Sequence, residues 1–301
     1  MTKNDNFKGA LLISLAMAGF TLSDAMIKLV TPHMYTGQIM FVRGAITSVL
    51  IFAVAWKLGA LRPPRVLADR YLLLRTLGEI VASITYITAL GSLPLPNASA
   101  ILQMLPLAVT MGAAVFFGES VGWRRWGAIL VGLIGVLIII RPGAEGFTVS
   151  ALLVVVSVLA AATRDLATRR INPNIPSLLI SAVTALVVTM VGAVLIVPFG
   201  GWKPVAAFDL GALTIGALAL FGGYQAVIMA MRTGDMSFVA PFRYTSLIWS
   251  IALGAFMLGE FPDTWMLVGS AIVIAAGLYA FNRERQRHRA PAMASDNQLA
   301  P

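Results

Sequence analysis

The chain has 301 residues and a net charge of +9, and 58% of its residues are hydrophobic whereas 12% are charged. A soluble domain averages about 25% charged residues, so this composition excludes an ordinary soluble fold and predicts a polytopic membrane protein. The basic residues lie in short connectors between apolar runs and in the C-terminal tail, where membrane orientation explains them better than binding to nucleic acid. We therefore expect a lipid bilayer around the protein and no nucleic-acid partner.

The sequence offers few groups for catalysis or metal binding. It contains no cysteine and two histidines, with His33 in a connector and His288 in the basic tail. Neither a metal site nor a Ser-His-Asp arrangement can be assembled from this set. The sequence also has no Gly-rich phosphate loop of the Walker type, which leaves an ATP-driven engine unsupported. We expect no cofactor and no enzymatic activity.

The predicted elements are ten membrane-spanning helices. A helix needs about 17–25 mostly apolar residues to cross the hydrocarbon core. The first apolar run is longer than the core of a secretory signal, so we interpret it as a retained helix. Windows of this length place the spans at 9–30, 36–57, 71–91, 97–117, 124–141, 149–169, 177–198, 209–230, 238–259 and 264–282.

Lysine and arginine predict the orientation of these spans. Most of them fall in connectors on the face that also carries both termini, whereas the opposite face receives Lys28, Arg141 and Lys203. Because positively charged connectors are retained in the cytoplasm, we expect a multi-pass protein of a bacterial inner membrane with both termini cytoplasmic. Residues 284–301 are basic and then polar, which predicts a disordered cytoplasmic tail.

An internal repeat divides the chain into two halves. An offset of 141 residues superposes acidic, basic and Gly-Glu positions, namely Asp24 on Asp165, Lys28 on Arg169 and Gly118-Glu119 on Gly259-Glu260. We expect one five-helix repeat over 1–145 and a second over 146–283. Because five is odd, the second repeat enters the membrane from the opposite side, so the repeats are inverted, which is an architecture typical of transporters.

Short motifs in each repeat carry a family resemblance. They are FFGES at Phe116–Ser120 and GLIGV at Gly132–Val136, echoed by MLGEF at Met257–Phe261. By these motifs the chain resembles the EamA-type transporters of the drug/metabolite transporter superfamily along nearly its whole length. The resemblance implies a secondary transporter with a central cavity built mainly by its first, third, fourth, sixth, eighth and ninth helices. Leu247 stands where the repeat of Pro106 would fall, which suggests that the two halves differ in helix breaking.

Charged residues inside spans are functional candidates, because a charge at the bilayer centre costs about 2.5–3.5 kcal/mol. Asp24 and Lys28 lie one helical turn apart and can neutralise each other. Asp165 and Arg169 recreate this pair in the second repeat. A structural ion pair and a role beside a cavity, including proton coupling by Asp24, both stay open.

Polar and aromatic residues inside the spans form the candidate cargo site. Arg243 is our preferred ligand anchor, with Tyr244 and Trp249 as neighbours. The alternative is that the Arg243 side chain extends to the cytoplasmic interface. Arg43 belongs to the family-like pattern, which favours a structural role for it. The other interior candidates are Glu79, Tyr86, Gln103, Tyr224 and Gln225, and we interpret Glu119 and Glu260 as residues that orient the turn into the next helix.

The function that these features favour is secondary transport of a small polar or amphipathic metabolite by alternating access. Arginines together with rings favour a cargo with an anionic or carbonyl-rich end and a planar body, such as an amino acid or a vitamin like riboflavin. A membrane-embedded enzyme and a non-transporting scaffold are the alternatives. The direction of transport, the coupling ion and the oligomeric state stay open.

Overall fold

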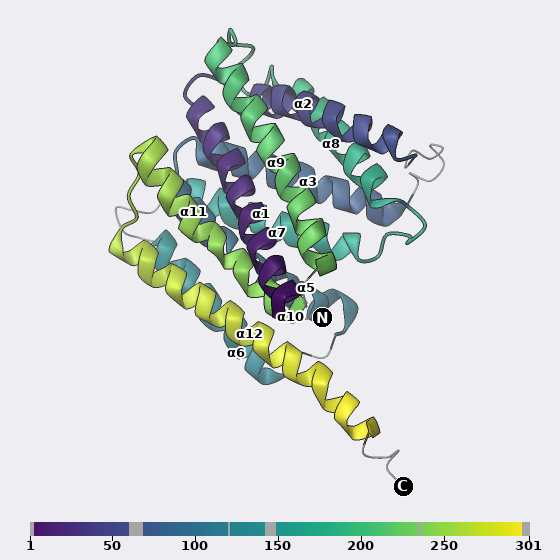
Figure 1. Cartoon of the computed structure of the whole chain (residues 1–301). Helices are drawn as coiled ribbons and strands as arrows, with labels where there is room; N and C mark the ends of the chain where they lie inside the picture. The colour runs from purple at the N-terminus through teal and green to yellow at the C-terminus, as the bar shows by residue number, and fades with distance from the viewer. Residues whose placement is uncertain (1–2, 60–68, 120, 142–148, 234–235, 297–301) are drawn as a thin grey trace.

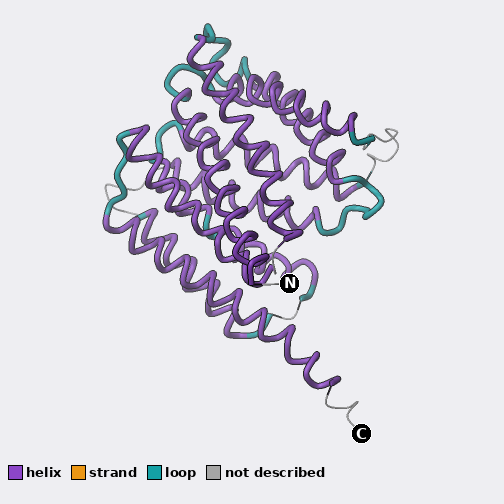
Figure 2. The backbone as a smooth tube through the Cα atoms, viewed as in Figure 1, coloured by secondary structure: helices purple, strands orange, loops and turns teal. Residues whose placement is uncertain are grey.

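The computed structural model describes residues 3–59, 69–119, 121–141, 149–233 and 236–296, and these residues form helices joined by loops (Figures 1 and 2). The elements are α1 (Lys3–Val30), α2 (Thr36–Lys57), α3 (Arg70–Leu90), α4 (Leu95–Leu102), α5 (Leu105–Phe117), α6 (Trp123–Ile140), α7 (Val149–Thr168), α8 (Ser177–Leu195), α9 (Ala207–Thr233), α10 (Met236–Val239), η2 (Ala240–Tyr244), α11 (Thr245–Leu253), η3 (Gly254–Leu258) and α12 (Thr264–Asp296).

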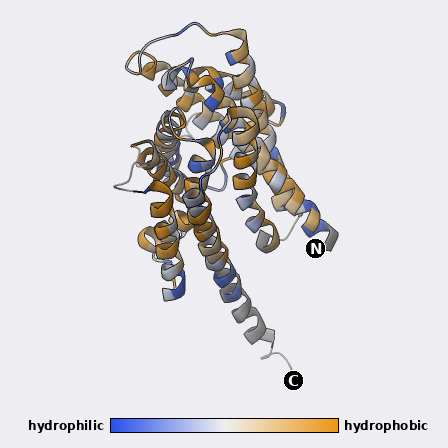
Figure 3. Ribbon diagram, turned by 90° about the vertical axis from the view of Figure 1, so that its left-hand side faces the viewer, coloured by the Kyte–Doolittle hydropathy of each residue, from blue (hydrophilic) through white to orange (hydrophobic). Residues whose placement is uncertain are grey.

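Nine helical segments in the described part of the chain are long and apolar enough to cross a membrane. They are α1, α2, α3, α4 together with α5, α6, α7, α8, α9 and the first part of α12, and they match nine of the ten expected spans. Hydrophobic residues colour most of the length of these helices (Figure 3). Large apolar side chains such as Phe256, Trp123 and Val197 are highly exposed, which fits a molecule surrounded by lipid rather than by water.

The remaining expected span, 238–259, is divided into α10, η2, α11 and η3. Pro241 lies at the start of the 3-10 turn of η2; it has no N–H for the helical ladder and clashes with a continuous helix. The fourth span is broken at the equivalent place, between Leu102 and Leu105. The two halves therefore differ in helix breaking, because the ninth span also contains the 3-10 turn of η2 and the π-helical turn of η3.

Both Gly-Glu motifs end a helix in the same way. Gly118 and Gly259 each have φ of 66°, in the left-handed region that glycine adopts without strain. The N–H of Glu119 donates to the carbonyl of Ala113, and the N–H of Glu260 donates to that of Gly254. Each of these bonds reaches the carbonyl six residues back, one residue further than in a Schellman C-cap, and the chain then turns toward α6 in one repeat and α12 in the other.

The repeats meet around a pseudo-twofold axis. The hydroxyl of Ser48 on α2 lies 3.2 Å from the hydroxyl of Thr189 on α8, and these two residues are counterparts at the offset of 141. Residues related by a twofold operation can touch only beside its axis. The arrangement of neighbours agrees, since α2 packs on α8, α6 packs on α12, and the α1–α9 contact has its equivalent in α3–α7 (Figure 1).

Small residues allow the α1–α9 and α3–α7 helix pairs to approach closely. A Cβ on Gly19 would lie 2.8 Å from the carbonyl oxygen of Ala219, and a Cβ on Gly78 would lie 2.8 Å from that of Ala160. The repeat offset relates Gly19 to Ala160 and Gly78 to Ala219. The same Gly–Ala contact therefore occurs once in each of the two helix pairs. Such small-residue contacts are the usual means of close helix packing in membranes.

The backbone of α12 is helical as far as Asp296. Over residues 284–296 this differs from the disorder that we expected for the tail 284–301, and residues 297–301 lie outside the described part of the chain. The segment is rich in Arg and Ala, which favour helix formation, so the helix of the last span continues past its apolar part even though it contains Pro291.

Candidate functional site

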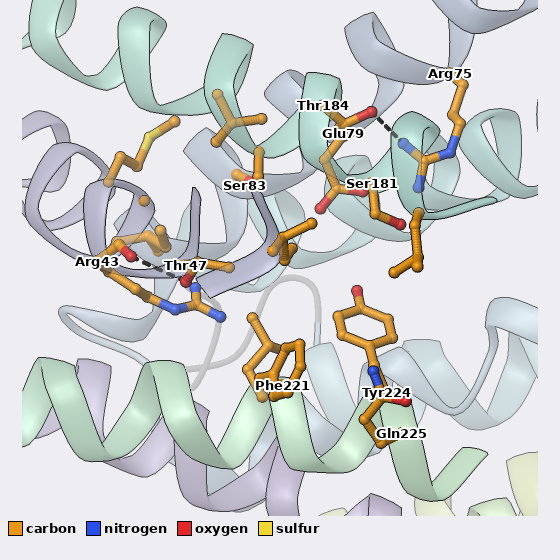
Figure 4. A pocket seen from close by; sticks show the side chains of 18 of the residues that line it. Arg43, Thr47, Arg75, Glu79, Ser83, Ser181, Thr184, Phe221, Tyr224 and Gln225 are labelled. Carbon is orange, nitrogen blue, oxygen red and sulfur yellow. Dashed lines mark hydrogen bonds between the residues drawn. The ribbon is translucent and has the colours of Figure 1, made fainter. Parts of the chain in front are cut away.

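A cavity of about 190 Å³ lies between α2 and α3 of the first repeat and α8 and α9 of the second (Figure 4). Its lining residues lie around the middle of α2 and α3, in the N-terminal half of α8 and in the C-terminal half of α9. Its polar lining residues are Arg43, Thr47, Arg75, Glu79, Ser83, Ser181, Thr184, Tyr224 and Gln225.

Two arginines supply the positive charge of this lining. Nη2 of Arg43 donates to the hydroxyl of Ser23 at 3.2 Å, and Nη1 of Arg75 donates to the hydroxyl of Thr184. The Nε of each guanidinium is buried and has no hydrogen-bond partner among the described residues. Each of these cations is therefore held by a neutral hydroxyl and keeps unused donors.

The carboxylate of Glu79 is already engaged by a third arginine. Arg164 on α7 donates from Nη1 to Glu79 at 3.0 Å and from Nε to Asp165 at 2.8 Å. All three side chains are partly buried. Because one guanidinium serves two carboxylates, Glu79 and Asp165 are tied to α7 rather than to the arginines of the cavity.

Aromatic side chains from α9 face the charged groups. Phe221 and Tyr224 rise from α9 into the space below Arg43, Glu79 and Arg75 (Figure 4). The ring of Tyr224 packs edge-on against Phe20 of α1, with centroids 5.2 Å apart. The cavity thus combines cationic groups on one wall with aromatic faces on the opposite wall.

The structure brings four of the expected cargo residues to this cavity, namely Arg43, Glu79, Tyr224 and Gln225. The cavity lining found here does not include Tyr86, Gln103, Arg243, Tyr244 or Trp249. Arg243 has an exposed side chain in η2, and its two expected roles, as ligand anchor or at the membrane interface, stay predictions.

Gln103 has a different place, at the breaks of the two divided spans. Its Nε2 donates to the hydroxyl of Ser246 at 2.8 Å and lies 3.5 Å from the carbonyl oxygen of Tyr244. It therefore joins the break after α4 to the break between η2 and α11.

Sequence reasoning missed Arg75, Thr184 and Phe221. Arg75 lies near the start of α3 but inside it, and it was not among the expected cargo residues. The sequence spacing could have indicated that Arg75 faces the cavity. Arg75, Glu79 and Ser83 follow one another at four-residue intervals and so share one face of a helix.

The expected ion pair between Asp24 and Lys28 is wrong. Lys28 instead pairs with Glu260 at 3.0 Å and donates to the carbonyl oxygens of Leu90 at 3.0 Å and Leu93 at 2.8 Å. Asp24 accepts a hydrogen bond of 3.0 Å from the hydroxyl of Tyr86. The reason is that the end of α3 presents unsatisfied carbonyl groups, which attract the ammonium away from its neighbour on α1.

The expected second pair is wrong in the same way. Asp165 accepts from Arg164, as described above, and Arg169 lies 3.8 Å from Glu119. Glu119 and Glu260 therefore do more than orient a turn, because each also faces a cation of the other repeat.

Comparison with known proteins supports this architecture. The model of the EamA-like transporter family matches residues 7–141 and 148–282. The chain is 26% identical over 281 residues to the S-adenosylmethionine uptake transporter of Rickettsia bellii, covering 90% of this chain and 92% of the relative. It is 28% identical over 207 residues to the riboflavin transporter of Rhizobium johnstonii, covering 69% and 68%.

Two further proteins are similar to this chain. The chain is 25% identical over 274 residues to the pseudopaline exporter CntI of Pseudomonas aeruginosa, covering 89% and 94%. A solved crystal structure with 17% sequence identity has a TM-score of 0.62 over 90% of this chain and 96% of that one, which shows the same fold. Since the family model covers both repeats, this chain belongs to the EamA-like transporter family and is a multi-pass membrane transporter of small metabolites.

Proposed function

We propose that the protein is a secondary transporter that moves a small polar or amphipathic metabolite by alternating access. The observation that carries the proposal is the composition of the cavity walls, with α2 and α3 from one repeat and α8 and α9 from the other. A relative movement of two inverted repeats changes the access to a site between them.

The lining favours a cargo with an anionic or carbonyl-rich end. Arg43 and Arg75 hold unused donors, whereas Glu79 is neutralised by Arg164. Guanidinium groups bind carboxylate and carbonyl oxygens through N–H donors in a fixed planar array. Phe221 and Tyr224 offer rings against which a flat body can pack. An amino acid or a vitamin such as riboflavin combines some of these features.

The relatives support a metabolite as the cargo and leave the direction to experiment. They include an uptake transporter, a riboflavin transporter and an exporter. Their names therefore do not favour import over export for this chain.

Uptake into proteoliposomes from a mixed metabolite pool tests the proposal, with and without a pH gradient. The Arg75→Gln variant should lose accumulation of the cargo, because the site loses one of its cations. Arg124→Gln, which changes an exposed arginine outside the cavity, is the matched control and should accumulate it normally. If no metabolite accumulates in the unaltered protein under either condition, a non-transporting scaffold becomes the better interpretation.

We also propose that the protein lies in a bacterial inner membrane with both termini in the cytoplasm. The distribution of lysine and arginine supports this orientation. Reporter fusions near Arg287 should report the cytoplasm, and fusions near Pro94 and Pro262 should report the outside. A cytoplasmic signal at Pro94 would reverse the orientation.

A further inference from the structure

Two ion pairs join the repeats at opposite ends of the bundle, and the repeat offset relates one to the other. Lys28 of the first repeat faces Glu260 of the second. Arg169, the counterpart of Lys28, faces Glu119, the counterpart of Glu260. Each pair therefore crosses between repeats, and the two pairs would be identical if the molecule had perfect twofold symmetry.

The Lys28–Glu260 pair is tight. The Nζ of Lys28 lies 3.0 Å from Oε1 of Glu260, and 11% and 20% of the two side chains are exposed. The other carboxylate oxygen of Glu260 accepts from the N–H of Leu95 at the start of α4, at 2.7 Å. With the bonds from Lys28 to the end of α3, this contact joins the ends of α1, α3 and η3 to the start of α4.

The Arg169–Glu119 pair is loose. Its nitrogen and oxygen are 3.8 Å apart, and 54% and 51% of the two side chains are exposed. A pair this open to water is screened and gains little from its Coulomb attraction. One structure thus contains the same contact in two states, closed at the Lys28 end and slack at the Arg169 end.

Other contacts join the repeats at both ends, and at the Arg169 end the N–H of Asn172 donates to Asp69 at 3.3 Å and Arg170 lies over the Phe117 ring at 4.3 Å. At the Lys28 end, His33 lies 2.8 Å from the carboxylate of Asp209. Gln38 donates to the carbonyl of Lys203 at 2.7 Å and accepts from its N–H at 3.1 Å. On α8 and α9 the residues that line the cavity lie in the halves nearer the Arg169 end, whereas on α2 and α3 they lie around the middle of each helix.

We propose that Lys28–Glu260 and Arg169–Glu119 are the two gates of the transport cycle and that they close alternately. When inverted repeats exchange conformations, each contact takes the state that its counterpart had. The 3.0 Å pair then opens and the 3.8 Å pair closes, and the cavity becomes accessible from the Lys28 side. The inference rests on the proposed transport function and names the residues that control access to its site.

The absence of native cysteine allows a direct test without any cargo. Ser83→Cys places one thiol in the cavity wall, and a membrane-impermeant maleimide is added to one face of vesicles at a time. Glu260→Gln removes the charge from the tight pair but keeps an oxygen that can accept from Leu95. We expect it to raise labelling from the Lys28 side about tenfold and to lower labelling from the Arg169 side, because it favours the opposite conformation.

Two controls separate gating from general loosening. Glu119→Gln weakens the pair that is already slack and should not raise labelling from the Lys28 side. Lys203→Gln removes a cation at the Lys28 end that lies over the Tyr35 ring at 4.0 Å, and it should leave labelling from both sides within about twofold of the parent.

Three results would overturn the proposal. They are unchanged labelling in Glu260→Gln, equal increases in Glu260→Gln and Glu119→Gln, or failure of Glu260→Gln to fold, which would make the pair a permanent tie. Because maleimide reactivity needs no cargo, the gates are judged separately from transport. If Glu260→Gln shifts the labelling but the protein takes up no metabolite, the proposed transport function is contradicted, whereas the alternate closing of the two ion pairs is supported.

Discussion

The amide of Gln103 lies 3.5 Å from the carbonyl oxygen of Tyr244, which is the counterpart of Gln103 in the second repeat. A residue that touches its own repeat mate lies beside the pseudo-twofold axis. The two helix breaks, after α4 and at η2, therefore meet there, and Gln103 also donates to Ser246 at 2.8 Å. Backbone groups at these breaks, which lack partners within a helix, find hydrogen-bond partners in the other repeat instead of in water.

Replacing Gln103 by Leu should lower stability by about 1 kcal/mol, because Ser246 and the carbonyl of Tyr244 lose a donor in a buried setting. The melting temperature in detergent measures the effect. Thr110→Val is a suitable control, because the Thr110 hydroxyl bonds within its own helix to the carbonyl of Pro106. Equal losses in the two variants would show that Gln103 contributes no contact between the repeats.

Replacing Arg164 by Met should lower stability by about 2–3 kcal/mol, because it leaves Glu79 and Asp165 as neighbouring carboxylates without their shared cation. The expected loss of stability is smaller than for breaking a fully buried ion pair, because 23% of the Arg164 side chain is exposed. Chemical or thermal unfolding in detergent provides the measurement. Adding Glu79→Gln should recover part of the loss, and a double variant less stable than Arg164→Met alone would contradict the shared-cation interpretation.

Lys28→Met and Glu260→Gln should be strongly non-additive, because these residues contact each other. The coupling between Asp24→Asn and Lys28→Met should be smaller than that between Lys28→Met and Glu260→Gln, because Asp24 is bound by Tyr86 and Lys28 by Glu260. Unfolding free energies of the single and double variants give both coupling energies. A larger coupling for Asp24 with Lys28 than for Lys28 with Glu260 would restore the pairing along α1.

Asp69 caps the N-terminus of α3 and should make stability depend on pH. Its carboxylate accepts from the N–H groups of Tyr71, Leu72 and Asn172. Desolvation by itself would raise the pKa of Asp69, but the hydrogen bonds from Leu72, Asn172 and Tyr71, together with nearby Arg70, outweigh it and lower the pKa. A lowered folded-state pKa gives stability that is present above the unfolded value of about 3.9 and is lost as the pH falls through the folded value.

Asp69→Ala should therefore lower the melting temperature at pH 7, by a capping effect of about 1 kcal/mol. The difference from the unaltered protein should shrink as the pH falls below about 3.9 and through the lowered folded-state pKa of Asp69. Asp69→Asn keeps one capping oxygen and should have a smaller effect at pH 7 that changes less with pH. A difference between Asp69→Ala and the parent that is constant from pH 7 to 3 would contradict the capping role.

The positions of the spans and the repeat followed from local properties of the chain. The length of an apolar run decides whether it can cross lipid, and Gly118 and Gly259 end their helices because the left-handed conformation suits glycine. Arg75 was not expected at the cavity, because a charge near the end of a span resembles part of a connector. The divided ninth span was also missed, although Pro241 marks it, because its mean hydropathy resembles that of a continuous helix.

The sequence by itself determined the all-helical membrane fold, the two five-helix repeats and their family, since these depend on apolar length, helix-ending residues and the offset of 141. Only the tertiary structure decided the partners of the charged residues. Lys28 and Asp24 are neighbours on one helix, yet Lys28 binds Glu260 of the other repeat, because unsatisfied carbonyl groups of α3 and a carboxylate converge there. Such convergence depends on how helices pack across the pseudo-twofold axis, which no local spacing encodes.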